Sequence, residues 1–387
     1  MSNVLSPYEL AKEVINRVCN ALGINEVVNV VHAHISGISY FNIGDYGLKL
    51  IKDLYLGGGK FKVYTTANPY AVVNTDFRGL RLDESIINKQ YEIVKYLTLL
   101  GAKGFTCAPY FIREPKPNEH LAWAESNAVL LANSYYGAKT NREGGPSALM
   151  SALVGYTCNS EIHKGNLSPT VEIKAINPRN ELEASALGYL IGKLYPHEVP
   201  YVLGIKVKDL ELIRSLLAAF GASASSPILI LDSVTPKYTY GEVSSDLLDK
   251  NILTTNDLRR FIKDVAHHDR ELRKDTLFIV GCPHLKSDDV IKLYEVLKEL
   301  SPAKYSSELW VLVHDSVPLS NYEVKLLASK GVKILEHVCP VVTRLSDFGV
   351  EEVITNSFKA LHYIPKISKI PTYVMSFKEI IKLLRGK

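Results

Sequence analysis

Three of the five cysteines in this 387-residue sequence stand where a predicted strand gives way to a loop. Cys107 belongs to a short predicted strand over 105–109, while Cys282 and Cys339 follow the apolar runs 277–280 and 332–335. A proline one or two positions later keeps each chain segment from continuing in its sheet. A single free cysteine is usually a small buried apolar residue. The shared placement of these three favours a common thiolate site.

The segment 138–147 is a candidate for binding an anion. Gly144 and Gly145 allow the backbone to approach a ligand closely, and the proline that follows them suits the start of a helix predicted to reach about residue 154. The amides at that helix start favour an anion, and Lys139 and Arg142 add positive charge. An ordinary capped turn with solvated charges explains the same residues equally well.

The turn 36–39 is a second candidate anion site, because it follows a predicted strand over 27–35 and precedes a predicted helix. Its backbone amides can bind phosphate. In a parallel sheet, the loops after neighbouring strands meet at one edge. The polar residues after the next predicted strand would then lie beside this turn. The candidates at this edge are Gly37, Ile38, Ser39, Asn68, Pro69 and Asn74.

His32 and His34 alternate along the predicted strand and therefore share one of its faces. Two histidines on one strand are more often core or hydrogen-bonded residues than a metal pair. We therefore expect them to be buried residues with hydrogen-bond partners.

The elements that must position these residues follow an α/β pattern. From about residue 201 onward, short apolar strands alternate with helical stretches, which is typical of largely parallel sheets flanked by helices. We predict a multi-lobe architecture with an N-terminal lobe over 1–198 and C-terminal lobes over 199–387. A further seam is predicted near 237–257.

Composition sets the class of protein. Apolar residues make up 47% and charged residues 22%, which fits a globular chain and argues against disorder. The net charge of +4 comes without a basic tract, so we expect no nucleic-acid partner. We find neither a membrane span nor a signal peptide, and we expect a cytoplasmic protein. Five cysteines, an odd number, do not indicate a disulfide framework.

Four segments of the sequence closely resemble the aconitase X family, and the likeness covers nearly the whole chain. The segments are CAPY at 107–110, EHLAWAES at 119–126, AKTNREGG at 138–145 and GCPH at 281–284. This family belongs to the aconitase superfamily of hydro-lyases. The resemblance implies an aconitase-like fold and an enzyme that removes water from a hydroxy acid.

The resemblance also implies a cofactor and a ligand set. The cofactor is a [4Fe-4S] cluster, and the family pattern places its ligands at Cys107, Cys282 and Cys339. Ordinary aconitases instead place two of their cluster cysteines in a CxxC, which this sequence lacks. Cys158 is the reserve ligand, and Cys19, on a helical face, is expected in the core.

Members of the family with a fused further domain are longer than this chain. We therefore expect a free-standing large subunit whose small-subunit partner carries the swivelling domain and the catalytic base. Glu119 and His120 are possible bases if the base lies on this chain instead. The residues expected to bind substrate are Gly37, Ile38, Ser39, Asn68, Pro69, Asn74, Lys139, Asn141, Arg142, Gly144 and Gly145.

The expected substrate is a small phosphorylated hydroxy acid, (R)-5-phosphomevalonate, which would be dehydrated to trans-anhydromevalonate 5-phosphate in the modified mevalonate pathway of isoprenoid biosynthesis. Two alternatives stay open on the sequence alone. One is a cis-3-hydroxyproline dehydratase or another hydro-lyase of this family. The other is a cluster-binding regulator without enzymatic activity.

Overall fold

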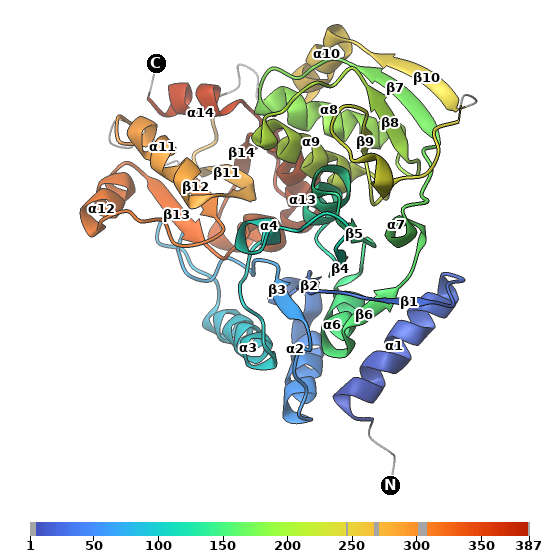
Figure 1. Cartoon of the computed structure of the whole chain (residues 1–387). Helices are drawn as coiled ribbons and strands as arrows, with labels where there is room; N and C mark the ends of the chain where they lie inside the picture. Colours follow the sequence, from blue (N-terminus) through green and yellow to red (C-terminus); the bar gives the residue numbers. More distant parts are fainter. Residues whose placement is uncertain (1–4, 245–246, 267–270, 301–307, 386–387) are drawn as a thin grey trace.

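A computed structural model of the chain describes residues 5–244, 247–266, 271–300 and 308–385 (Figure 1). It contains three parallel sheets, each with helices packed beside it, and one short antiparallel strand pair. The expected α/β class with largely parallel sheets is confirmed. Among the described residues, no helix is both long and apolar enough to cross a membrane.

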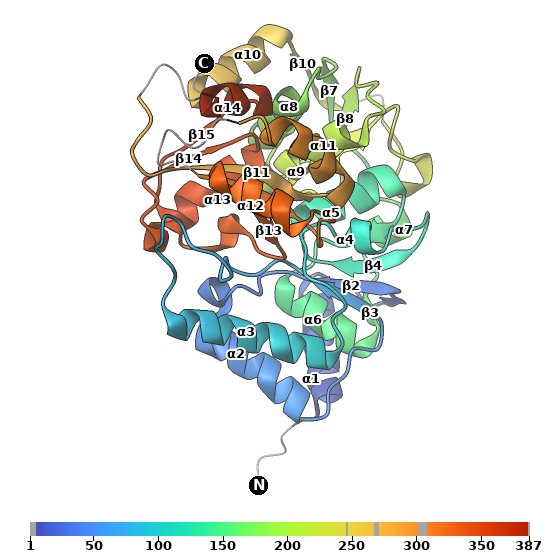
Figure 2. The ribbon, with the colours of Figure 1, turned by 90° about the vertical axis from the view of Figure 1, so that its left-hand side faces the viewer.

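The first region, in blue and green, has a four-stranded sheet in the order β3-β2-β4-β5 (Figure 1). Figure 2 shows α1, α2, α3 and α6 grouped on one side of this sheet. The strands of this region are β1 (Val27–Asn29), β2 (His32–Ile35), β3 (Tyr64–Ala67), β4 (His120–Trp123), β5 (Lys139–Thr140) and β6 (Tyr156–Cys158). Its helices are α1 (Pro7–Ala21), α2 (Tyr40–Leu56), α3 (Glu84–Leu100), α4 (Pro109–Ile112), α5 (Ser126–Leu131), α6 (Gly145–Val154) and α7 (Glu161–Lys164).

The second region has a four-stranded parallel sheet in the order β10-β7-β8-β9. Its strands are β7 (Val171–Ala175), β8 (Pro200–Leu203), β9 (Ile230–Leu231) and β10 (Leu248–Leu253), and its helices are α8 (Glu181–Leu194), α9 (Leu210–Ser223) and α10 (Thr255–Val265). Strand β7 precedes residue 198 and pairs with β8, which follows it. The segments on either side of the predicted lobe boundary therefore share one sheet. The predicted seam near 237–257 contains β10, although its residues 245–246 lie outside the described residues.

The third region has a five-stranded parallel sheet in the order β13-β12-β11-β14-β15. Its strands are β11 (Thr276–Leu285), β12 (Glu308–Val313), β13 (Val332–Glu336), β14 (Glu352–Thr355) and β15 (Thr372–Val374), and its helices are α11 (Ser287–Leu297), α12 (Asn321–Ser329), α13 (Phe358–Ser368) and α14 (Phe377–Leu384). These strands pack almost entirely in the interior, which explains why they read as continuous apolar runs in the sequence.

Two predicted elements around the first cysteine are wrong. The segment 105–109 is no strand, because only Phe105 forms a bridge, to Ala67 at the end of β3. The sequence also predicts a helix capped by Asn118 that includes Trp123, Leu130 and Leu131. In the structure Asn118 caps no helix and has a positive φ of 63°. Strand β4 follows instead, and α5 then begins after Glu125. Strand β4 is short and almost wholly buried, so its sequence lacks the alternation that marks a half-exposed strand.

Candidate active site

The three predicted cluster cysteines come from three segments that the fold brings together. Cys107 follows the bridge at the end of β3, Cys282 lies within β11, and Cys339 follows β13. The Cys339 amide donates to the Tyr70 carbonyl at 2.9 Å, so this loop is hydrogen-bonded to the first region. Among the described residues, these three are the cysteines with free thiols.

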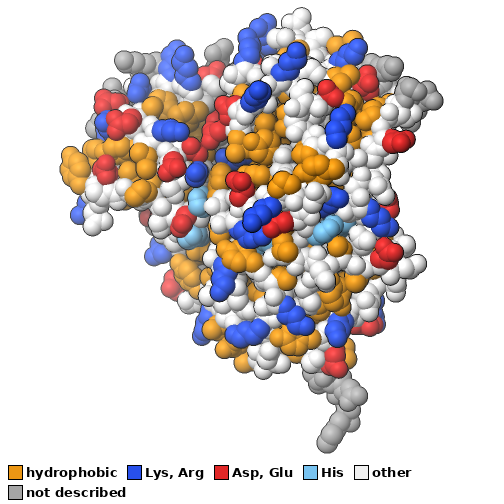
Figure 3. Space-filling view, in the orientation of Figure 1, with side chains coloured by type: hydrophobic (Ala, Val, Ile, Leu, Met, Phe, Trp, Pro, Cys, Tyr) orange, Lys and Arg blue, Asp and Glu red, His pale blue; other side chains and the backbone are white. Residues whose placement is uncertain are grey.

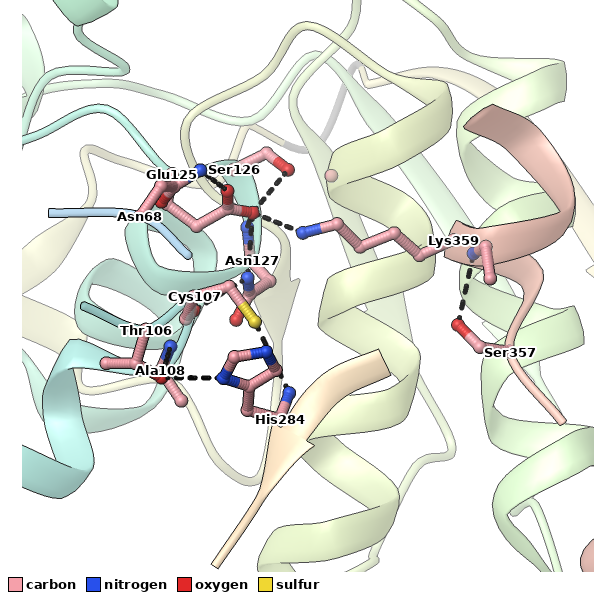
Figure 4. A network of polar contacts seen from close by, with 12 residues as sticks. Asn68, Thr106, Cys107, Ala108, Glu125, Ser126, Asn127, His284, Ser357 and Lys359 are labelled. Carbon is pink, nitrogen blue, oxygen red and sulfur yellow. Dashed lines mark hydrogen bonds and ion pairs between the residues drawn. The ribbon is translucent and has the colours of Figure 1, made fainter. Parts of the chain in front are cut away.

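His284 connects the three cysteine-bearing segments. Its backbone N–H donates to Cys107 Sγ at 3.3 Å, and its Nδ1 accepts from the Thr106 hydroxyl at 3.1 Å (Figure 4). Its Nε2–H donates to the Val338 carbonyl at 3.0 Å. The carbonyl of Val338 can only accept, which fixes this tautomer. Burial lowers the pKa of His284 to about 3, so the ring is neutral. Through its ring and its backbone N–H, His284 thus joins the three segments that carry the cysteines.

Two opposing effects act on the pKa values of the three thiols: burial and a nearby ammonium. Burial raises the pKa of Cys107 to about 12 and also raises the pKa of Cys282 and Cys339. The Lys359 ammonium acts in the opposite direction on all three thiols. Buried thiols that gain a nearby cation are suited to binding a metal centre, because the metal removes their protons.

Glu125 and Lys359 form a buried ion pair beside these cysteines (Figure 4). Glu125 is the N-cap of α5 in the first region, and Lys359 lies in the first turn of α13 in the third. The carboxylate also accepts from the side-chain amides of Asn68 at 2.7 Å and Asn127 at 2.8 Å. Burial opposes its charge, but Lys359 and these amides outweigh it, and the pKa of Glu125 is lowered to about 2.

Lys359 remains charged for the complementary reason. Burial disfavours the ammonium, but the Glu125 carboxylate, with smaller effects from the nearby Cys107 and Cys282 sulfurs, raises the pKa of Lys359 above the ordinary value. An ammonium has three N–H donors, and Glu125 accepts one of them. The pair therefore presents a fixed cation and a fixed anion next to the three thiols.

The structure brings the two predicted glycine-containing loops together. A Cβ on Gly145 would lie 2.4 Å from the Ser36 carbonyl oxygen, so the residue must be glycine for the loops to touch. Gly37 has a positive φ of 72°, and the Ser39 hydroxyl donates to the Val342 carbonyl at 2.6 Å, near Cys339. The loops 36–39 and 144–145 therefore lie beside the third cysteine-bearing segment.

Asn68 follows β3 and lies in the site, where it contacts Glu125. Pro69 is the next residue and is buried, whereas Asn74 is exposed. His32 and His34 are fully buried and hydrogen-bonded, as expected.

Three predicted residues are not brought to the cysteines. Lys139 and His120 begin neighbouring strands, at the opposite end of the sheet from Glu125. The His120 Nδ1 lies 3.0 Å from His163 Nδ1. Glu119 forms a two-pronged ion pair with Arg113, with N–O distances of 2.6 and 3.0 Å.

Asn141 and Arg142 hold neighbouring segments in place. The Arg142 guanidinium donates to the Gly221 carbonyl at 2.6 Å and to the Ala224 carbonyl, so it caps the end of α9. The Asn141 amide donates to the Cys158 carbonyl at 2.9 Å. Both side chains donate to backbone carbonyls of neighbouring segments. A direct role of either residue toward a substrate stays a prediction.

Cys19 and Cys158 are joined by a disulfide, which corrects two expectations. The sequence pattern argued against disulfides, and Cys158 was the reserve cluster ligand. An odd number of cysteines does not exclude one bridge, because 139 residues separate the two in sequence while the fold packs α1 against β6. A bonded sulfur is not available as a thiolate, and this removes Cys158 from the ligand set.

Sequence reasoning missed Glu125, Lys359 and the connecting role of His284. Glu125 lay inside a predicted helix, where a carboxylate reads as a solvated side chain. Lys359 is 234 residues away and gave no signal of its own. His284 stands two residues after the predicted ligand Cys282, and this proximity was the one available hint.

Comparisons with known proteins show the family to which the chain is similar. Residues 6–165, 169–263 and 276–385 match the first, second and third domains of aconitase X. The phosphomevalonate dehydratase large subunit of Methanocaldococcus jannaschii is 32% identical, over 97% of this chain and 96% of that protein. The cis-3-hydroxy-L-proline dehydratase of Pseudomonas aeruginosa is 28% identical, over 59% of this chain and 40% of that protein.

A solved structure matches over most of the chain. The holo-form of aconitase X from Thermococcus kodakaraensis superimposes with a TM-score of 0.84 at 28% identity, covering 97% of this chain and 95% of that one. All three regions of the fold are therefore shared, including the segments that carry the cysteines. The chain belongs to the aconitase X family and is an enzyme of the hydro-lyase class.

Proposed function

We propose that this chain is the large, catalytic subunit of a two-subunit hydro-lyase that dehydrates (R)-5-phosphomevalonate to trans-anhydromevalonate 5-phosphate. The observation that carries the proposal is the convergence of three free thiols on a buried Glu125–Lys359 pair. The likeness to a relative named a phosphomevalonate dehydratase large subunit supports the choice of substrate class.

We further propose that Cys107, Cys282 and Cys339 hold a [4Fe-4S] cluster. The donor set fits, because three thiolates leave one iron of such a cluster without a protein ligand. Among the described residues, no three His, Cys, Asp or Glu side chains converge closely enough to hold a single metal ion. A cluster does not require that closeness, since each thiolate binds a different iron. When bound, the cluster supplies a Lewis acid for the departure of a hydroxyl group.

The residues of this chain then bind and orient the substrate. Lys359 offers two further N–H donors to an anionic group, while Glu125 keeps the ammonium charged and fixed in position. The adjoining loops 36–39 and 144–145 offer backbone amides and a helix start for a second anionic group. A substrate with a carboxylate and a phosphate fits two such places, whereas hydroxyproline has no phosphate.

The proton at the carbon next to the carboxylate must be removed by a base. Glu125 is a poor base because its pKa is about 2 and Lys359 neutralises it. We therefore propose that the base lies on a small subunit carrying the swivelling domain, which would close over the site in a cytoplasmic heterodimer. The "large subunit" in the name of the Methanocaldococcus relative supports this division.

The test is anaerobic reconstitution of this chain with a small subunit, followed by product analysis with (R)-5-phosphomevalonate and with cis-3-hydroxy-L-proline. Dehydration of the phosphorylated acid alone is expected. Dehydration of hydroxyproline alone would support the alternative hydro-lyase, and a loaded complex that turns over neither compound would favour a cluster-binding regulator.

A further inference from the structure

A continuous row of hydrogen-bonded, buried polar side chains, called the file below, connects the interior of the first sheet to the candidate active site. Its members are His32, Thr66, His34, Asn68 and Glu125. His32 Nε2 lies 2.9 Å from Thr66 Oγ1, and the same hydroxyl lies 2.7 Å from His34 Nδ1. His34 Nε2 lies 2.9 Å from Asn68 Oδ1, and Asn68 Nδ2 donates to Glu125 at 2.7 Å. His32, His34 and Thr66 are fully buried, so solvent does not compete for these contacts.

The register of the sheet creates this file. His34 on β2 lies directly opposite Thr66 on β3, and the two strands are parallel. Asn68 directly follows β3, so it leaves the sheet at the carboxyl end, where Glu125 begins α5. Each side chain therefore comes from a rigid element or its immediate end.

Only one assignment of donors and acceptors satisfies every hydrogen bond of the file. An ionised Glu125 can only accept, so Asn68 must turn its NH2 group toward it and its oxygen toward His34. That oxygen requires a proton on His34 Nε2, and a neutral His34 then accepts at Nδ1. The Thr66 hydroxyl has one proton, which goes to His34, and so His32 must donate from its own Nε2.

The charge state of both rings agrees with this order. Burial lowers the pKa of His34 to about 4 and lowers the pKa of His32 well below its ordinary value. Both rings are therefore neutral near pH 7. His32 Nδ1 is then a bare acceptor, and it ends the file because it has no hydrogen-bond partner among the described residues.

We propose that His34 and Thr66 are positioning residues that fix the amide of Asn68, and through it the carboxylate of Glu125, for the reaction. A flipped Asn68 would place its oxygen against the carboxylate and its NH2 against the Nε2–H of His34, so the file excludes that orientation. The expected effect on kinetics rests on the proposed function. The directions of the hydrogen bonds do not depend on it.

The first test compares Thr66→Val with Thr66→Ser in the reconstituted complex. Valine keeps the shape but removes the hydroxyl, whereas serine keeps it. We expect kcat/KM to fall about five- to hundredfold in Thr66→Val, the range for leaving a buried polar group unpaired. Thr66→Ser should stay within about twofold of the unsubstituted chain. Equal kinetics in both variants would overturn the proposal.

The second test is 15N NMR of the histidine rings in the full chain, with the His34 signal assigned through His34→Gln. We expect the neutral tautomer with the proton on Nε2 at pH 7, because the Asn68 oxygen accepts it, and a changed Nδ1 shift in Thr66→Val, because Nδ1 then loses its donor. A proton on Nδ1 or a charged ring in the unsubstituted chain would overturn the proposal. This readout needs no substrate, so it decides the hydrogen-bond order even if the reconstituted complex fails to dehydrate phosphomevalonate.

Discussion

Each of the three free thiols makes a separate contribution to the proposed cluster site. Replacing Cys107, Cys282 or Cys339 with serine removes one thiolate ligand, and we expect loss of bound iron, of the visible absorption and of activity in each variant. Cys19→Ser is the matched control, because it changes a buried cysteine of the first region that is bonded to Cys158 instead. Full iron and sulfide content in any one of the three variants would remove that residue from the ligand set.

The Glu125–Lys359 pair allows stability and catalysis to be separated. Lys359→Met leaves a buried carboxylate uncompensated, which typically costs about 3–5 kcal/mol of unfolding free energy. The double variant Lys359→Met/Glu125→Gln should regain much of that stability in denaturant titrations, because neither charge remains. It should not regain activity, since the ammonium is gone. Wild-type turnover in the double variant would exclude Lys359 as a substrate ligand.

At the scale of elements, the contact between the two glycine-containing loops is the feature most open to test. Gly145→Ala would drive a methyl group into the Ser36 carbonyl, so we expect the loops to separate and the KM to rise at least several-fold. Gly144→Ala is the control, because its Cβ would meet only ordinary contacts, with Ser147 Oγ at 3.7 Å as the nearest atom. Equal KM values in the two variants would contradict a binding role for this contact.

Helix α7 provides a pH-dependent test of packing away from the site. Burial lowers the pKa of His163 to about 3, so the unfolded chain binds a proton more readily than the folded one between pH 6.5 and 3. Stability is therefore complete above pH 6.5 and decreases as the pH falls through this window. Urea titrations at several pH values give the unfolding free energy as a function of pH. In His163→Gln, this free energy should change less steeply with pH, by up to about 1.4 kcal/mol per pH unit. An unchanged slope would contradict a neutral buried His163.

The sequence predicted those elements whose signals are local. Asp83 and Gly101 are typical helix start and stop signals, and they bound α3. The short strands predicted after residue 201 overlap β8, β9, β11, β12, β13, β14 and β15, whereas β10 was not predicted. Strand β4 was missed because a short, buried strand and a buried helix share the same apolar pattern. The Cys19–Cys158 bridge and the Glu125–Lys359 pair depend on contacts between distant segments, which periodicity does not encode.

At the scale of the whole molecule, the candidate site exists only where the regions meet. Glu125 and Cys107 come from the first region, while Cys282, Cys339 and Lys359 come from the third (Figures 1 and 4). Arg214 of α9, in the second region, donates to the His284 carbonyl at 2.8 Å and so contacts the residue that connects the cysteine-bearing segments. Figure 3 shows basic and acidic side chains interspersed on the visible face.

Partner dependence is the prediction that belongs to this scale. Because the ionised, paired Glu125 is a poor base, we expect the isolated, cluster-loaded chain to show negligible turnover and to gain it when a small subunit is added. Titrating the small subunit at constant chain concentration should saturate at one partner per chain. Full activity without a partner would require a base on this chain and would contradict the two-subunit proposal.

The central claim is that the three thiols and the Glu125–Lys359 pair form a site that dehydrates a phosphorylated hydroxy acid. The most direct measurement is NMR detection of product after (R)-5-phosphomevalonate is added to the anaerobically reconstituted complex. We predict trans-anhydromevalonate 5-phosphate, and none from the Cys282→Ser complex. Unchanged substrate in a complex with full iron and sulfide content would contradict the claim.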